Sequence, residues 1–224
     1  MASENNLIIG DGNTVKIGSA GNSISGSGNV CGYNVTNGLI IGAANTIGST
    51  TDNAASPNNG AVVFGVNGTA LRYGETVLNS GGATAGAAQC SIVMLVKTIP
   101  NGTTAYQECF IQGQATNLGR IMLGLNSATG FRIRASAFVQ NWGGWYMEVA
   151  GAIGIDDAVG KTVMVGTNAT KALRTVSGKT DDWRVRATAD ATNGALKIEV
   201  KTQTGAGGAA VDFVVCVELF QSKA

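Results

Sequence analysis

The stretch Leu7–Asn29, LIIGDGNTVKIGSAGNSISGSGN, decides the fold of the first part of the chain. Glycine and asparagine return together in it every seven to nine residues, at Asn13, Asn22 and Asn29, with short aliphatic segments between them. Both residue types tolerate positive φ, so each pair predicts a sharp corner between short strands. A phosphate-binding loop has one glycine cluster that opens a helix, whereas this stretch repeats the cluster with no helix-forming segment after it.

The pattern continues to about residue 82 and indicates a β-solenoid. Two corner units, about 14–17 residues, predict one coil. Such a coil offers only one or two apolar residues, so stacking along the axis and a second apolar surface are both expected. Three identical chains around one axis would supply that surface. Residues 49–59 have no apolar periodicity and predict a loop, after which the candidate buried residues are Val62, Phe64, Leu71 and Val77.

Beyond residue 82 the strands become longer and alternate between apolar and polar residues. The alternation is clear in FRIRASAFV (131–139), DWRVRATA (182–189) and ALKIEVKT (195–202). One polar face predicts antiparallel strands half exposed to water, arranged as a β-sandwich of about eight strands. SIVMLVKTI (91–99) and DFVVCVELF (212–220) are apolar on both faces, which predicts central strands or strands buried between chains. The predicted inward residues are Phe131, Ile133, Ala135, Ala137, Val139, Trp183, Val185, Ala187, Leu196, Ile198 and Val200.

Composition excludes several classes of protein. The 224 residues contain 33 glycines, two prolines and no histidine, and the net charge is +1. Without histidine there is no Ser-His-Asp or Cys-His nucleophile and no histidine metal site. No basic stripe indicates a nucleic-acid partner, and no apolar run reaches membrane-spanning length. The first ten residues lack the pattern of a signal peptide. We therefore expect no cofactor, no nucleic acid and no membrane insertion.

Catalysis and metal binding find little support in the motifs. Neighbouring carboxylates at Asp156 and Asp157 would point apart on a strand or turn, whereas a glycosidase needs two that flank a sugar. Asp11 or Asp52 offers too few ligands for a calcium site. Cys90 and Cys109 are either small buried hydrophobes or a disulfide between neighbouring strands. We expect no enzyme activity, no catalytic residue and no metal ligand.

One aromatic cluster is the candidate ligand-binding site: Trp142, Trp145 and Tyr146, around Gly143-Gly144. Gly-Gly between alternating strands predicts a tight hairpin, with the two tryptophans flanking its tip. Paired tryptophans at such a tip bind the faces of sugar rings. The alternative is that both pack on a neighbouring loop or subunit, which leaves nothing for a receptor.

Two resemblances to known families follow from these motifs. LIIGDGN, VKIGSAGN, LIIGAAN and VVFGVNGTA resemble the head repeats of trimeric autotransporter adhesins, which implies a trimeric left-handed β-roll over residues 1–82. DDWRVRATADATNGALKIEVKTQTGAGGAAVDFVVCVEL resembles the C-terminal domain of many phage tail-fibre proteins, which implies a β-sandwich tip over residues 83–224. The sequence VQNWGGWYMEV departs from that family, which usually has a polar, charged turn there.

The resemblances imply a homotrimeric fibre tip that attaches to a cell-surface receptor, most simply a glycan. The protein would lie in a virion tail fibre, or on a bacterial surface if its origin is not a phage. Two other functions remain open at this point. One is a purely structural fibre protein with no receptor, and the other is a tail protein that degrades polysaccharide.

Overall fold

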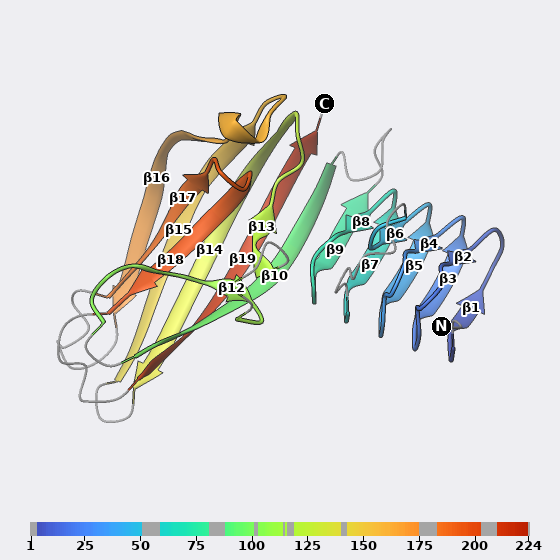
Figure 1. The fold of residues 1–224 in the computed structure, drawn as a ribbon, viewed down its shortest axis with the longest axis horizontal. Helices are drawn as coiled ribbons and strands as arrows, with labels where there is room; N and C mark the ends of the chain where they lie inside the picture. The colour runs from blue at the N-terminus through green and yellow to red at the C-terminus, as the bar shows by residue number, and fades with distance from the viewer. Residues whose placement is uncertain are drawn as a thin grey trace. The chain divides into compact units, whose positions relative to one another are not determined.

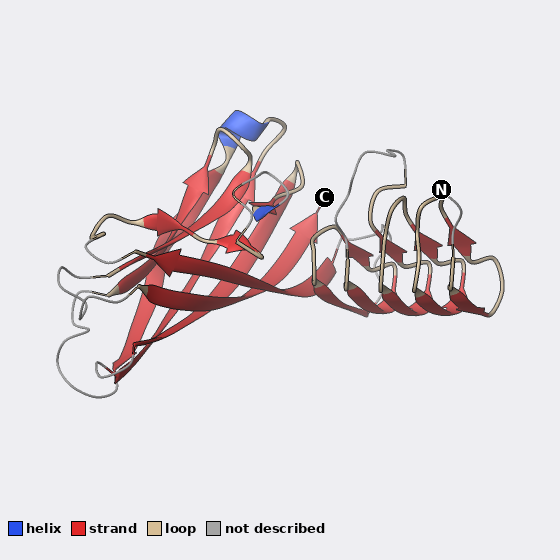
Figure 2. Cartoon of the chain, turned by 60° about the horizontal axis from the view of Figure 1, so that its bottom comes forward, coloured by secondary structure: helices blue, strands red, loops and turns tan. Residues whose placement is uncertain are grey.

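The chain folds almost entirely into β-strands, which confirms the predicted all-β class (Figures 1 and 2). A computed structural model describes residues 4–50, 59–80, 88–100, 103–113, 115, 119–139, 143–174, 183–202 and 210–223. No helix in these segments is long and apolar enough to cross a membrane. Two compact units form: Met1–Val93 with Leu219–Ala224, called here the coil unit, and Met94–Glu218, called the sandwich unit. The predicted boundary at residue 82 lies outside the described residues.

The coil unit is a stack of parallel strands whose coils repeat every 16 residues in its first part, within the predicted range. Leu7 pairs with Ser23, and Ser23 pairs with Leu39. The longer sheet follows the order β1-β3-β5-β7-β9, drawn as successive rungs in Figure 1. The bounds are β1 (Leu7–Ile9), β3 (Ser23–Ser27), β5 (Leu39–Ala43), β7 (Val62–Val66) and β9 (Thr76–Ser80).

A second, shorter parallel sheet forms the other wall of each coil. Its order is β2-β4-β6-β8, and its strands are two residues long. Strands this short are stable only because each coil is hydrogen-bonded to the next along the stack. The bounds are β2 (Thr14–Val15), β4 (Val30–Cys31), β6 (Thr46–Ile47) and β8 (Thr69–Ala70).

The core of the coil unit forms within a single chain. Ile24, Ile40, Val63 and Val77 lie on successive rungs, point inward and are at most 1% exposed. They pack with the short-strand residues Cys31, Ile47 and Ala70 and with Val35 and Ala61. The expectation that one chain could not build such a core is therefore wrong. Side chains alternate across a strand, so one aliphatic per rung points inward while its neighbours point outward.

The same alternation corrects the predicted buried residues of the last coils. Val77 is buried as expected, but its partner on the preceding rung is Val63, which points inward with it. Val62 and Phe64 therefore point outward and are half-buried. Leu71 lies outside a strand and is 60% exposed.

Asparagine side chains tie neighbouring coils together at two corners. Asn29 donates from its Nδ2 to the Oδ1 of Asn13 (3.0 Å) and to the carbonyl of Gly42 (2.9 Å). Its own Oδ1 accepts from the backbone N–H of Asn45 at 3.0 Å. Asn22 is held by Asn6 in the same way. The expected bonding of Asn13, Asn22 and Asn29 between coils is confirmed, since buried backbone groups at a corner require such partners.

The residue before each ladder asparagine takes the positive φ that turns the chain. Gly12, Gly21 and Gly28 have φ of 64°, 67° and 62°. Ala44 takes the same conformation before Asn45, with φ of 54°. Glycine and asparagine thus have separate tasks at each corner: the first residue turns the backbone, and the second joins the coils.

The sandwich unit contains two sheets. The larger has the order β10-β19-β14-β15-β16, with β12 (Phe110–Ile111) paired to β10, and the smaller has the order β11-β18-β13 with β17 beside β18. A short 3-10 helix, Val159–Lys161, precedes β16. The larger sheet comprises β10 (Ala88–Ile99), β19 (Val211–Lys223), β14 (Ser127–Val139), β15 (Gly143–Ile155) and β16 (Val163–Arg174). The smaller comprises β11 (Gln107–Glu108), β18 (Ala195–Lys201), β13 (Ile121–Met122) and β17 (Arg184–Asp190).

The core of this unit lies between the two sheets and follows the predicted alternation. Every predicted inward residue from Phe131 to Val200 is buried, except Val139, whose side chain lies outside the description. The two strands predicted to be apolar and buried on both faces differ from that expectation. Met94 and Val96 on β10 and Val214 on β19 are 47%, 39% and 43% exposed, because only alternate residues of these strands face the core.

All four cysteines are free thiols, so Cys90 and Cys109 do not form the disulfide that was one alternative. Cys31 and Cys109 are buried, as expected for small hydrophobes. Burial raises the pKa of Cys31 to about 11 and that of Cys109 to about 12. Both thiols therefore stay protonated and unreactive at neutral pH.

Candidate functional site

The aromatic cluster predicted at a hairpin tip lies largely within a strand. β14 and β15 pair continuously from Ser127↔Ile155 to Val139↔Gly143. The two glycines of the Trp-Gly-Gly-Trp sequence are therefore the first residues of β15 and do not form a turn. Trp142 lies outside the described residues, so its predicted contact with a receptor stays a prediction.

Trp145 belongs to the core of the sandwich unit. It is 2% exposed, and its ring centroid lies 5.6 Å from Phe213 and 6.4 Å from Trp183. Trp183 precedes β17, and Phe213 is on β19, so the three rings join the two sheets. Its proposed contact with a receptor is a correction: a residue opposite Ala137 in the ladder points into the sandwich, and the exposure required for that contact is missing.

Tyr146, the next residue, points to the opposite, outer face of the larger sheet. It pairs with Ser136 in the ladder and is half-buried. Its hydroxyl donates a hydrogen bond to Oε1 of Glu148 at 2.5 Å. Burial and this hydrogen bond raise the pKa of the Tyr146 phenol, so it remains a neutral donor.

A shallow hollow of about 330 Å³ lies beside Tyr146 on this outer face. Strands β10, β19, β14 and β15 all contribute to it. Arg134 on its wall forms an ion pair with Glu218, which fixes the guanidinium. The lining residues are Met94, Arg134, Ser136, Tyr146, Val214 and Cys216.

The hollow combines an apolar floor with a few polar groups at its rim. Met94 and Val214 supply exposed apolar surface, while Arg134 and Ser136 supply a charged donor and a hydroxyl. An aromatic ring with such groups matches the mixed apolar and hydroxyl surface of a sugar ring. The alternation in FRIRASAFV placed Arg134 on the polar face, but its neighbours come from strands about 40 and 80 residues away along the chain, so no local pattern indicated the hollow.

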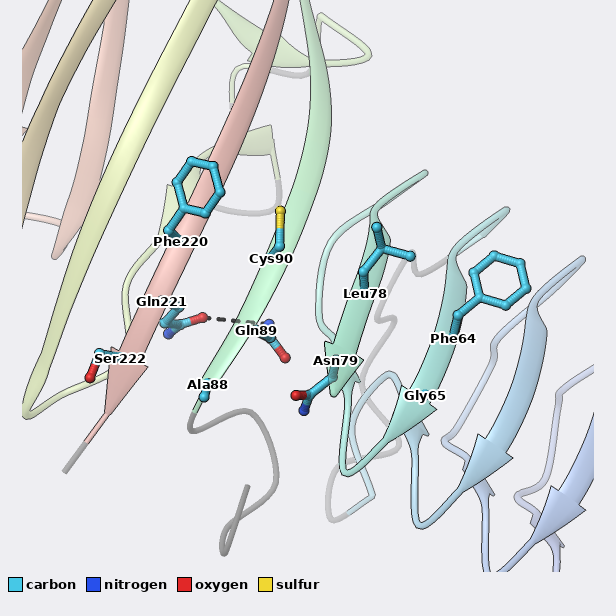
Figure 3. A pocket seen from close by; sticks show the side chains of 10 residues that line it. All are labelled: Phe64, Gly65, Leu78, Asn79, Ala88, Gln89, Cys90, Phe220, Gln221 and Ser222. Carbon is cyan, nitrogen blue, oxygen red and sulfur yellow. Dashed lines mark hydrogen bonds between the residues drawn. The ribbon is translucent and has the colours of Figure 1, made fainter. Parts of the chain in front are cut away.

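A second hollow, of about 710 Å³, lies on the outward face of the coil unit. Figure 3 shows its apolar members Phe64, Leu78, Cys90 and Phe220, which come from β7, β9, β10 and β19. Its polar members include Gln89 and Gln221, whose side chains are hydrogen-bonded at 3.5 Å. This hollow continues a row of outward apolar side chains along the coils.

Carboxylates of the sandwich unit are engaged by basic residues. Glu199 is buried on β18 and accepts from Arg186 at 2.7 Å and from Lys197 at 3.1 Å. The guanidinium of Arg186 also lies 3.8 Å from the ring centroid of Tyr106. Burial alone would raise the pKa of Glu199, but the bonds from Arg186 and Lys197 outweigh it and hold that pKa below its usual range.

The carboxylates considered for catalysis or metal binding have structural surroundings. Asp156 and Asp157 are largely exposed and pair with Lys161 at 3.7 and 2.6 Å. Asp190 accepts from the backbone N–H groups of Thr192 and Asn193, which fixes the turn after β17. In the part of the chain that the structure describes, no group of three or more acidic or cysteine side chains is placed to hold a metal ion.

Comparison with known proteins gives a limited result. No family model matches the chain, and no curated protein matches it. Among solved structures, the tailspike protein of Acinetobacter baumannii phage AM24 is similar at 10% identity and a TM-score of 0.33, over 97% of this chain and 49% of that one. The tailspike protein gp49 of A. baumannii bacteriophage Fri1, a capsular polysaccharide depolymerase, is similar at 10% identity and a TM-score of 0.31, over 96% and 46%. The chain thus spans about half the length of each, and no function is carried over from them.

Proposed function

We propose that this chain is a homotrimeric tip protein of a phage tail fibre, and that it attaches to a cell-surface saccharide without degrading it. The proposal combines the two resemblances in the sequence with the outer faces of the two units. The coil unit supplies the surface for assembly, and the sandwich unit supplies the surface for attachment.

The observation that carries the proposal is an apolar row on the outward face of the coil unit. Ladder pairing aligns one residue per strand, and the aligned residues are Ile9, Ser25, Ile41, Phe64, Leu78 and Cys90. Ile9, Ile41 and Leu78 are each between 43% and 57% exposed. Contiguous exposed apolar surface of this kind marks an interaction site in a soluble protein.

The row suits association with further copies of the same chain. It runs along the axis of the stack, with a spacing of about 4.8 Å between rungs. Copies that lie side by side with parallel axes would therefore match rung for rung. None of the aligned residues is charged, so burying them costs no ion desolvation.

Light scattering tests the assembly. We expect a mass of about three times 22.6 kDa for the purified chain. The double variant Ile41→Ser, Leu78→Ser copies the serine already present at Ser25 and should yield monomers with unchanged circular dichroism. Ile17→Ser removes an exposed aliphatic side chain outside the row and should leave the trimer intact. A monomeric parent chain would overturn the assembly.

Attachment is tested on the trimer with a glycan array and with whole-cell binding. Three copies of a weak site multiply through avidity, so the loss of one aromatic contact should be easily measured. Tyr146→Ala should reduce binding at least tenfold, whereas Val163→Ala, at an exposed position of β16, should not. Release of reducing sugars from capsule or lipopolysaccharide would assign a degrading enzyme instead. Binding to neither saccharides nor cells would leave a purely structural fibre protein.

A further inference from the structure

The N-terminal end of the coil stack is open at its core. Ile8 is the first member of the inward column that continues through Ile24 and Ile40 to Val63 and Val77. Those four are at most 1% exposed, whereas Ile8 is 46% exposed. Ile8 thus points inward on its rung but has no coil above it. An aliphatic side chain in that position is placed for burial by a further layer.

The asparagine ladders are open at the same end. In the lower rungs, the backbone N–H and the Nδ2 of each asparagine both donate to the carboxamide oxygen 16 residues earlier, as Asn29 does to Asn13. Asn6 and Asn13 occupy the first rungs. Their amide groups donate downward, to the carbonyls of Ser19 and Gly26. Within the described residues, no carboxamide lies above either of them.

The opposite end of the stack is closed by two devices. β10 pairs antiparallel with β9, from Cys90↔Leu78 to Ile92↔Thr76, and covers the edge of the longer sheet. The side chain of Gln89 bonds the backbone of Thr69 and covers the edge of the shorter sheet. A second copy of this chain therefore cannot offer a free terminal coil that stacks in parallel on the open end.

We infer that the N-terminal end of the coil unit is an axial docking surface for the terminal coil of a different polypeptide, itself a parallel β-coil. The partner's last coil would present two carboxamide oxygens, one over Asn6 and one over Asn13, and an aliphatic side chain over Ile8. Docking would bury Ile8 and pair the free edges of β1 and β2, which is how exposed strand edges are normally satisfied. This surface is separate from the side-to-side apolar row, so neither inference depends on the other.

An added coil tests whether the end accepts this structure. A second copy of the 16 residues Leu7–Asn22 is inserted directly before Leu7 in the full chain, which places an asparagine above Asn13 and an isoleucine above Ile8. Amide hydrogen exchange at Leu7–Ile9 should slow at least about tenfold, and the melting temperature should rise. The matched control carries valine in place of both asparagines in the inserted copy and should give much less protection. Unchanged exchange in the first variant would overturn the inference.

A second arm tests docking between separate chains. The probe is a synthetic peptide copying Leu7–Gly38, two coils long, added to the unmodified protein. Slower exchange at Leu7–Ile9 that saturates with peptide concentration, and that Ile8→Asp abolishes, would support the inference. No protection at millimolar peptide would contradict it. End-to-end association of the protein alone, lost in Ile8→Asp, would assign the end to a second copy and overturn the choice of partner.

Discussion

The side-chain amide of Gln89 acts as one more strand for Thr69. Its Oε1 accepts from the backbone N–H of Thr69 and its Nε2 donates to the carbonyl of the same residue, both at 3.1 Å. Gln89 thereby satisfies the last short strand, β8, where the 16-residue coils have ended. One side chain thus replaces the backbone pairing that a further coil would have supplied.

Replacing Gln89 by alanine should release that edge. Two hydrogen bonds to a partly buried backbone are lost, which should cost about 1–3 kcal/mol of unfolding free energy. Chemical denaturation measures the loss, and hydrogen exchange should show faster exchange at Thr69. Gln221→Ala removes only the long contact to Gln89 and is the control, with little change expected. Equal stability of the parent and Gln89→Ala would show that water replaces the amide at no cost.

The asparagine ladder should depend on its interior members. Asn29→Val removes the bonds to Asn13, Gly42 and Asn45 and leaves buried donors and acceptors without partners. We expect a cost of roughly 1–3 kcal/mol per chain. Asn13→Val, on the half-buried first rung, should cost less because water reaches its partners. Thermal melting compares the two variants, and identical melting temperatures would contradict a ladder that stabilises by burial.

Ala44 should be the weakest corner residue, and Ala44→Gly should stabilise the fold. Alanine at φ of 54° bears a steric cost of roughly 1–2 kcal/mol, which glycine relieves. Part of that gain is offset because glycine is more flexible in the unfolded chain. Gly28→Ala is the reciprocal variant. It has φ of 62° and open space for a Cβ, so it should be destabilised through backbone strain alone. Opposite signs are expected in denaturant melts, and a destabilised Ala44→Gly would refute the strain.

Trp145 and Tyr146 should separate stability from attachment. Trp145→Ala leaves a cavity between Trp183 and Phe213 and should cost about 3–5 kcal/mol. Tyr146→Ala should change the melting temperature little, since its ring lies on the outer face. Tryptophan emission offers a second readout: opening of the cavity should shift the emission of the buried Trp183 to longer wavelength. A stable Trp145→Ala variant would remove this residue from the core.

The sandwich unit should lose stability in acid partly through Glu199. The bonds from Arg186 and Lys197 hold the folded-state pKa of Glu199 below the ordinary value of about 4.3. The folded chain therefore binds fewer protons there than the unfolded chain. The contribution of Glu199 to stability is complete above that ordinary value and is lost as the pH falls through the folded-state pKa. Denaturation at pH 7, 5, 4 and 3 should show a shallower decline in Glu199→Gln. A decline equal to that of the parent would contradict the assignment.

Much of the fold could be read from the sequence because its signals are local. The corners at Asn13, Asn22 and Asn29 follow from backbone preferences of single residues, and the alternation around Phe131 fixes which side faces inward. The choice between Val63 and Phe64 was not fixed in this way. Both faces of that strand are apolar, and only its register with Val77 decides which residue points inward.

The site was harder to predict for a different reason. Gly143-Gly144 has the composition of a turn, but the long ladder between β14 and β15 keeps both residues in the strand, and this places Trp145 inside. Tyr146 then faces outward by alternation alone. Its neighbours Met94 and Val214 reach it through sheet pairing between distant segments, which no window of sequence contains.

The ladder also passes over an interruption in the sequence. Asn45 bonds the N–H of Gly68, 23 residues later, in the same way that Asn29 bonds Asn45 after 16. Extra residues inserted at that corner leave the pairing of Ile40 with Val63 intact. The length of this connection is thus a free variable of the architecture. A foreign peptide epitope could be grafted between Gly48 and Gly60 while the coils on either side keep their register, which makes this corner a natural display point for engineering.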